Sequence, residues 1–148
     1  MKILFVCNGN VTRSPIAVAL LRERLRQQPG FDIEVDSAGI DTDEEAPSSK
    51  AVAVMSEVGL DISRHRPKLI SERSVEWADL ILTMTPLQAE RILGAYRVAD
   101  RKTHVLGDYV GEPEAVEDPD GGTIQRFRET RDQVSRLTDA LVQRLMRE

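Results

Sequence analysis

One short run of the sequence brings together a thiol, a guanidinium and a turn-forming stretch. It reads Cys7-Asn8-Gly9-Asn10-Val11-Thr12-Arg13-Ser14. The run follows the apolar residues 3–6 and precedes Pro15, which suits the first turn of a helix. Between a strand and a helix, the backbone N–H groups of such a loop converge on one point and bind an anion. The same donors stabilise a thiolate at Cys7, and Arg13 can bind phosphoryl oxygens bidentately. The run therefore predicts phosphoryl transfer through cysteine.

Taken singly, these residues have ordinary explanations. A buried cysteine at the end of an apolar strand usually packs as a small hydrophobe, and a lone arginine usually lies on the surface. Gly9 lets the backbone curl inward and Pro15 favours a helix start, so the combination favours a phosphate site. The position agrees with this interpretation, because parallel α/β sheets bind ligands at the carboxyl ends of their strands.

With these residues the chain resembles the low-molecular-weight protein tyrosine phosphatases. The resemblance extends over nearly all of the 148 residues, and the matching segments are the Cys-x5-Arg-Ser-Pro loop, Asp36-Ser37-Ala38-Gly39, His65 and Asp118-Pro119. It implies that Cys7 is the nucleophile, Arg13 the phosphate clamp and Asp118 the general acid, with residues 8–14 binding the phosphate. It also implies a set of side chains that hold the loop in shape, namely Asn10, Ser14, Ser37 and His65. One departure is Thr12, where many members have a second cysteine.

The chemistry expected from this resemblance has two steps and needs no metal ion or cofactor. The phosphoryl group passes to Cys7 while protonated Asp118 supplies a proton to the departing oxygen. Ionised Asp118 then activates a water molecule that hydrolyses the phosphocysteine. The loop N–H groups and Arg13 stabilise the charge on the equatorial oxygens. Because Cys7 and Asp118 must be in opposite protonation states, activity should have a bell-shaped pH dependence.

Other functions could also use a cysteine in such a loop. Thioredoxin-coupled arsenate reductases share the loop and fold, but they need further cysteines, and this chain has one. A phosphocysteine carrier has no need of Arg13 and Asp118 together. A plain phosphate-binding module has no need of the thiol. These two modules remain the alternatives of another class.

The substrate preference is divided within the family. Protein arginine phosphatases have threonine at the position of Val11, and their acid segment reads Asp-Pro-Phe-Gly-Gly. Here that segment is Asp118-Pro119-Asp120-Gly121-Gly122. Tyrosine-specific members have an aliphatic residue at the Val11 position but usually aromatic residues after Asp-Pro. Val11 therefore favours phosphotyrosine, whereas the carboxylate of Asp120 favours a guanidinium. We predict a protein phosphatase that acts on phosphotyrosine, with arginine phosphatase as the alternative.

Length and composition predict one globular domain, residues 1–148, with 41% hydrophobic and 30% charged residues. A net charge of −5 without a basic block argues against a nucleic-acid partner. The single cysteine fits a reducing compartment, and no apolar run approaches the about 20 residues that span a bilayer. We therefore expect a cytoplasmic protein without a membrane partner. Its expected partners are phosphorylated proteins, with inorganic phosphate as product and competitive ligand.

Short apolar runs alternate with helical patterns along the chain. Strands are predicted at 2–6, 33–35, 80–82 and 104–106, and helices at 14–27, 47–58, 87–95 and 122–146, with a helical turn around Trp77. We expect a turn at residues 36–39 and an irregular segment at 107–121 that projects Asp118 over the pocket. The alternation predicts an α/β three-layer sandwich, with a four-stranded parallel sheet, helices on both faces and the phosphate-binding loop after the first strand.

Overall fold

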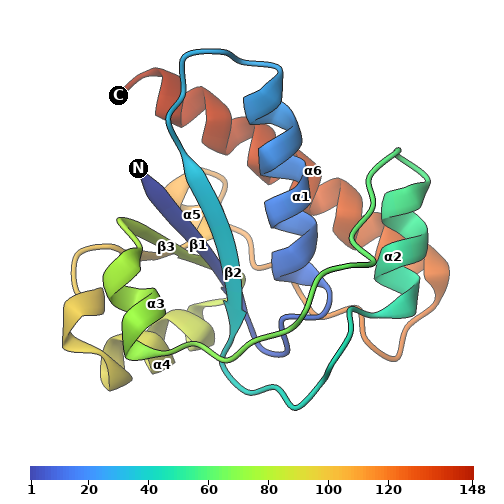
Figure 1. The fold of residues 1–148 in the computed structure, drawn as a ribbon, viewed down its shortest axis with the longest axis horizontal. Coiled ribbons are helices and arrows are strands. Elements are labelled where there is room, and N and C mark those ends of the chain that lie inside the picture. The colour runs from blue at the N-terminus through green and yellow to red at the C-terminus, as the bar shows by residue number, and fades with distance from the viewer.

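The computed structural model describes all residues from Met1 to Glu148. Its centre is a sheet of four parallel strands in the order β2-β1-β3-β4 (Figure 1). The strands are β1 (Lys2–Cys7), β2 (Glu34–Gly39), β3 (Leu80–Thr83) and β4 (Thr103–Val105). Because all strands run in the same direction, their carboxyl ends lie along one edge of the sheet. Cys7, the last residue of the central strand β1, lies at that edge.

Helices cover both faces of the sheet. They are α1 (Arg13–Arg26), α2 (Ser49–Ser56), α3 (Glu72–Trp77), α4 (Pro86–Ala95), α5 (Leu106–Tyr109) and α6 (Ile124–Met146), with a 3-10 turn at Arg97–Ala99. Successive side chains of a strand point to opposite faces, so Ile3 and Phe5 enter the core beneath α1 and α6, whereas Leu4 and Val6 enter the core beneath α3 and α4. The predicted three-layer, single-domain α/β fold is confirmed. None of the helices combines the length and the apolar composition needed to cross a bilayer.

Two local predictions are wrong. Residues 36–39 do not form a turn but continue β2 as far as Gly39, because they pair in register with Leu4–Cys7 of β1. Residues 107–121 are not irregular throughout, since α5 occupies Leu106–Tyr109 and buries Leu106 in the core beneath α1. In both segments, pairing and burial override the turn preference of the glycines.

Candidate active site

The loop of residues 8–12, between β1 and α1, turns its carbonyl groups outward. The carbonyl oxygens of Cys7, Asn8 and Val11 accept hydrogen bonds of 3.0, 3.0 and 2.9 Å from backbone N–H groups outside the loop. By contrast, the N–H groups of residues 8–12 donate to no acceptor of the protein. Because the N–H and C=O of a trans peptide point in opposite directions, outward carbonyls turn the N–H groups inward. A concave set of free N–H groups at a helix N-terminus is suited to bind an anion.

Two residues allow this tight loop. Asn10 reverses the backbone with a φ of 56°, a left-handed conformation that asparagine tolerates better than most residues. We expected the backbone to reverse at Gly9, but the reversal occurs at Asn10. An added Cβ at Gly9 would meet only the Val11 side chain, at 3.5 Å. The second residue is Gly39 at the end of β2. A Cβ at Gly39 would lie 2.8 Å from the carbonyl oxygen of Asn8, so glycine permits the loop to approach the neighbouring strand.

The buried side chain of Asn10 joins the loop to three other segments. Its Nδ2 donates to the hydroxyls of Ser14 and Ser37 at 2.8 and 2.9 Å, and its Oδ1 accepts from the Lys68 backbone N–H at 3.0 Å. The Nε2 atom of His65 donates to the Asn10 carbonyl oxygen at 2.6 Å. Burial lowers the pKa of His65, which favours the neutral ring. The structure thus brings together all four residues that we expected to hold the loop in shape.

The hydroxyl of Ser14 lies 3.0 Å from the sulfur of Cys7, which is 2% exposed. Because the Ser14 oxygen already accepts a hydrogen bond from Asn10, its own proton is available to the sulfur. A hydrogen bond donated to sulfur stabilises the thiolate relative to the thiol. Asn10, Ser14 and Cys7 therefore form a buried chain of contacts, an arrangement that would suit a cysteine nucleophile.

Arg13 joins the loop to the segment that carries Asp118. Its side chain is buried, and Nη1 donates to the carbonyl oxygen of Val116 at 2.9 Å. Nη2 lies 3.7 Å from Oδ2 of Asp118, whose side chain is 45% exposed. The backbone N–H of Val116 in turn donates to the carbonyl oxygen of Met84, just beyond β3, at 2.9 Å. Residues 116–118 are therefore held beside the loop, and Arg13 and Asp118 lie together as expected.

The mouth of this site is a cavity of about 650 Å³ with an acidic, non-aromatic lining. Val11 and Asp120, the two residues expected to determine selectivity, both line it. The carboxylates that line it come from two segments and are Asp41, Asp43, Glu44, Asp118 and Asp120. Partial burial raises the pKa of Asp120, and the charge of Asp118 adds to this increase. The five carboxylates together allow the mouth to attract a positively charged group, although the raised pKa reduces the contribution of Asp120.

Gln88, a residue that no sequence pattern marked as part of the site, is buried and supports the loop from α4. Its Nε2 donates to Oδ1 of Asn8 at 3.0 Å, while its Oε1 accepts from the N–H groups of Met84 and Thr85 at 2.9 and 3.1 Å. The pattern Thr85-Pro86-Leu87-Gln88 is a capping box that could have predicted the start of the helix. It contains no signal for the contact with Asn8, which depends on how α4 packs against β3 and β4.

Comparison with known proteins finds relatives over nearly the whole length of the chain. A family model described as low molecular weight phosphotyrosine protein phosphatase matches residues 2–148. A protein-arginine-phosphatase of Geobacillus stearothermophilus is 37% identical over 149 residues, covering 99% of this chain and 97% of that protein. A probable low molecular weight protein-tyrosine-phosphatase of Ralstonia nicotianae, EpsP, is 38% identical over 144 residues, covering 97% of this chain and 94% of that protein. A solved structure of the YwlE arginine phosphatase, a mutant with a phosphorylated active-site serine, superposes with a TM-score of 0.94 at 31% identity, covering 100% of this chain and 97% of that one.

Proposed function

Because this chain belongs to the low molecular weight phosphotyrosine protein phosphatase family, we propose that it hydrolyses phosphotyrosine in phosphorylated proteins through a phosphocysteine on Cys7. The observation that carries the proposal is the loop of residues 8–12, whose N–H groups face inward above a buried cysteine and beside Arg13. These groups supply the positive charge that a phosphoryl group requires, so no metal ion or cofactor is needed. Inorganic phosphate, the product, competes for the same loop.

In the first step, the Cys7 thiolate attacks the phosphorus of a phosphomonoester bound in the loop. The sulfur–phosphorus bond forms as the bond to the phenolic oxygen breaks, and protonated Asp118 gives its proton to that oxygen. Arg13 and the loop N–H groups hold the three equatorial oxygens, where negative charge is spread in the transition state. This step leaves a phosphocysteine and an ionised Asp118.

In the second step, water attacks the phosphocysteine from the side that the phenol has left. The Asp118 carboxylate accepts a proton from this water as the oxygen–phosphorus bond forms. The sulfur–phosphorus bond breaks, and the Ser14 hydroxyl, 3.0 Å from the sulfur, stabilises the departing thiolate. Inorganic phosphate is released and the enzyme returns to its initial state.

The Cys7→Ser variant tests this proposal. Its hydroxyl is not ionised at neutral pH, so we expect no turnover of a phosphotyrosine peptide but retained binding of inorganic phosphate by calorimetry. Arg13→Ala is expected to lose both turnover and phosphate binding. Turnover by Cys7→Ser at a rate comparable to the natural protein would contradict the covalent mechanism, and loss of activity in a metal chelator would contradict metal independence.

Phosphoarginine is the second candidate substrate, and the acidic mouth is the observation that favours it. Asp118 and Asp120 line a cavity with no aromatic side chain to stack on a phenol ring. Val11 has no hydroxyl to orient water near a phosphoramidate, which favours phosphotyrosine. The kcat/KM values of matched phosphotyrosine and phosphoarginine peptides decide between them, and a higher value for phosphoarginine would replace our first proposal. We expect Val11→Thr to increase phosphoarginine turnover and Asp120→Tyr to increase phosphotyrosine turnover.

We also propose that the protein works in the cytoplasm. The mechanism requires Cys7 as a thiolate, and the protein contains no second thiol to rescue it after oxidation. A reducing compartment protects such a residue. Fractionation of cells followed by immunoblotting tests this location.

A further inference from the structure

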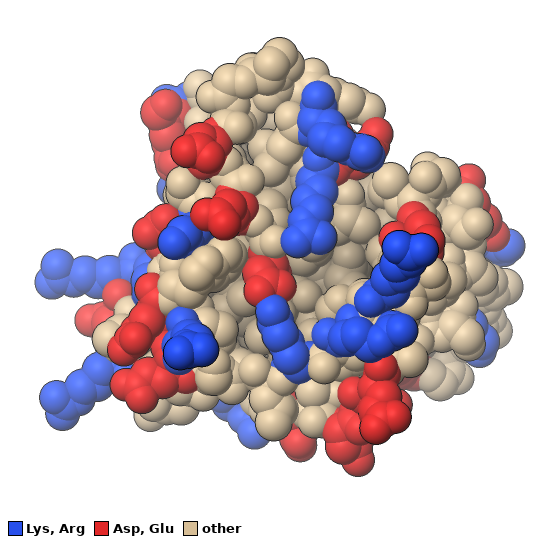
Figure 2. Space-filling view, in the orientation of Figure 1, with Lys and Arg blue, Asp and Glu red and all other residues tan.

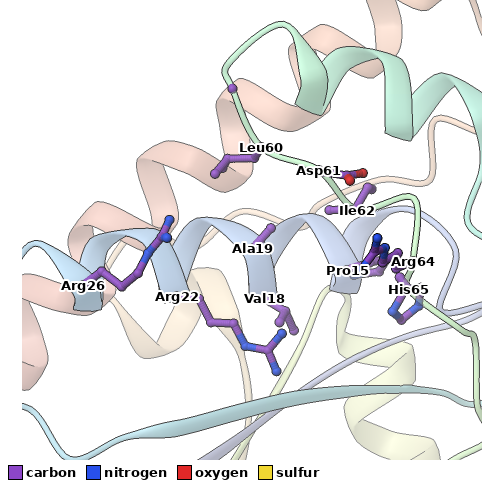
Figure 3. Close-up of a pocket in the computed structure, with 11 residues that line it drawn as sticks. Pro15, Val18, Ala19, Arg22, Arg26, Leu60, Asp61, Ile62, Arg64 and His65 are labelled. Atoms are coloured by element: carbon purple, nitrogen blue, oxygen red, sulfur yellow. The ribbon is translucent and has the colours of Figure 1, made fainter.

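A second cavity, of about 640 Å³, lies along α1 and shares no lining residue with the mouth of the proposed active site (Figure 3). One wall is a single face of α1 from Pro15 to Arg26, and the other is the connection from Gly59 to His65. The helix rises by about 1.5 Å per residue, so the wall is about 16 Å long. An extended peptide advances by about 3.3 Å per residue, and about five residues would fill this length. We call this cavity the α1 groove.

The α1 groove has an aliphatic floor and a basic rim. Its apolar lining consists of Pro15, Val18, Ala19, Leu60 and Ile62. Three arginines stand around this floor, and they are Arg22, Arg26 and Arg64. On the face drawn in Figure 2, several basic side chains border a hollow beside α1, with acidic side chains among them, although the protein as a whole carries a net charge of −5. The lining of the groove, with three arginines and one aspartate, is therefore net basic, whereas the molecule as a whole is acidic.

Two of these arginines have no carboxylate partner in the protein. Arg22 donates to the backbone carbonyl of Val35 at 2.7 Å, and Arg64 is exposed without an ion pair. Arg26, by contrast, is paired with Glu23. Asp61 is the only acidic side chain that lines the groove, and its carboxylate accepts a hydrogen bond of 2.8 Å from the Ser63 N–H. The rim thus carries net positive charge, with Arg22 and Arg64 outside any ion pair and Asp61 as the one acidic side chain that lines the groove beside them.

We propose that the α1 groove binds an extended acidic segment of a partner protein. Aliphatic side chains of that segment lie on the floor, and its carboxylates pair with Arg22 and Arg64. A peptide is favoured over a nucleic acid because no aromatic side chain lines the groove to stack on a base.

The α1 groove ends beside the phosphate-binding loop, but no residue of the loop lines the groove. Pro15 and His65 line this end, and His65 donates to the carbonyl oxygen of Asn10 on the outer side of the loop. The N–H groups of the loop face the opposite way, toward the anion site described above. An acidic segment in the groove and a phosphate in the loop can therefore be bound at the same time.

The probe for this proposal is a fluorescein-labelled peptide, Glu-Leu-Glu-Glu-Leu-Glu, titrated with the full chain in low salt and followed by fluorescence anisotropy. We expect saturable binding that weakens at least tenfold in Arg64→Glu and severalfold in Arg22→Ala. Arg73→Glu is the matched control, because Arg73 is an exposed arginine on α3 and the change in charge is identical. It should change the Kd by less than twofold. Saturating inorganic phosphate should leave the peptide bound.

Several outcomes of the binding measurements would overturn the proposal. They are the absence of saturable binding, equal weakening in Arg73→Glu, displacement of the peptide by inorganic phosphate, and tighter binding of single-stranded DNA of equal charge. Circular dichroism checks that each variant is folded, and Arg64→Gln replaces Arg64→Glu if the latter is not. In heteronuclear NMR of the natural protein, the peptide should shift the amide signals of Ala19, Leu60 and Ile62. Shifts confined to the phosphate loop would also contradict the proposal.

Discussion

The guanidinium of Arg13 lies 3.7 Å from the carboxylate of Asp118, although the two residues come from opposite ends of the chain. The same guanidinium donates to the carbonyl oxygen of Val116 at 2.9 Å. The group that we propose to bind the phosphoryl oxygens therefore also holds the segment that carries the proposed acid. Loss of Arg13 should remove both effects at once, which makes Asp118 the more informative residue to change.

Asp118→Asn should slow turnover in proportion to the basicity of the leaving group. An amide cannot donate the proton that a basic leaving oxygen needs, so we expect a loss of about 10²–10⁴-fold for poorly activated esters. The loss should be much smaller for activated aryl phosphates. The measurement is kcat for a series of aryl phosphates, with Asp100→Asn as a control at an exposed site. An equal loss across the series would assign Asp118 a structural role.

Gly39→Ala should damage the phosphate loop from the neighbouring strand. The added Cβ would lie 2.8 Å from the Asn8 carbonyl oxygen and 3.0 Å from the Asn10 Cβ, so the loop must move. A small misplacement of catalytic groups is costly, and we expect kcat/KM to decrease by roughly 10- to 100-fold. Phosphate affinity, measured by calorimetry, should fall as well.

Gly94→Ala is the matched control for this change. Gly94 lies in α4, and no atom lies within 4 Å of the position of an added Cβ. Alanine favours a helix, so this variant should keep full activity and gain about 0.4–1 kcal/mol of stability. Similar activity of Gly39→Ala and Gly94→Ala would show that the contact of β2 with the loop is not needed.

Peroxide should inactivate the enzyme, and thiol reductants should restore activity only after a short exposure to peroxide. Cys7 is the only cysteine, so a sulfenic acid formed there has no second thiol with which to close a disulfide. Prolonged exposure should oxidise it further, and mass spectrometry should locate the added oxygen on Cys7. Bound inorganic phosphate should slow the reaction, and Thr12→Cys should recover more activity than the natural protein. Full recovery by dithiothreitol after long exposure would contradict this prediction.

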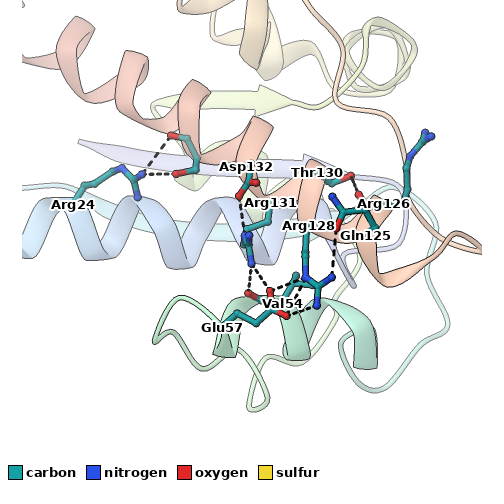
Figure 4. Close-up of polar contacts among 10 residues, drawn as sticks. Arg24, Val54, Glu57, Gln125, Arg126, Arg128, Thr130, Arg131 and Asp132 are labelled. Carbon is teal, nitrogen blue, oxygen red and sulfur yellow. Dashed lines mark hydrogen bonds and ion pairs between the residues drawn. The ribbon is translucent and has the colours of Figure 1, made fainter.

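Glu57, just after α2, joins this helix to α6 (Figure 4). Its carboxylate accepts hydrogen bonds from Arg128 and Arg131, each as short as 2.8 Å, and Arg131 also donates to the Val54 carbonyl oxygen at 2.9 Å. The hydrogen bonds from Arg128 and then Arg131 lower the pKa of Glu57 from 4.5 to about 2. The folded state therefore stabilises the ionised carboxylate.

Glu57→Gln should reduce stability at neutral pH and much less in acid. The contribution of Glu57 is complete above its unfolded pKa of 4.5 and is lost as the pH falls toward about 2, because the unfolded chain binds a proton first. Urea unfolding at several pH values measures the difference between the natural protein and the variant. Glu76→Gln, at an exposed position of α3, is the control. If the difference in the free energy of unfolding between the natural protein and Glu57→Gln does not decrease between pH 4.5 and pH 2, the role of the ion pairs is contradicted.

The central chemistry could be predicted from the sequence because it lies in one contiguous run. Cys7 and Arg13 belong to the same loop, whose geometry depends mainly on local backbone preferences. The alternation of apolar and helical patterns likewise predicted the parallel sheet and both helical layers. The expected roles of Ser37 and His65 rest only on the family resemblance, whereas that of Asp118 also rests on its position before Pro119 in a segment expected to be irregular.

Contacts between distant segments were decided by the tertiary structure. The pairing of β1 with β2 extended the strand to Gly39 and placed that glycine against the loop. The packing of α4 places Gln88 beside Asn8. The connection from Gly59 to His65 lies along α1, and the two form the α1 groove. Such contacts depend on strand register and on which faces of the elements become buried together. Local sequence patterns specify the elements, whereas the packing of side chains from all of them determines which residues meet.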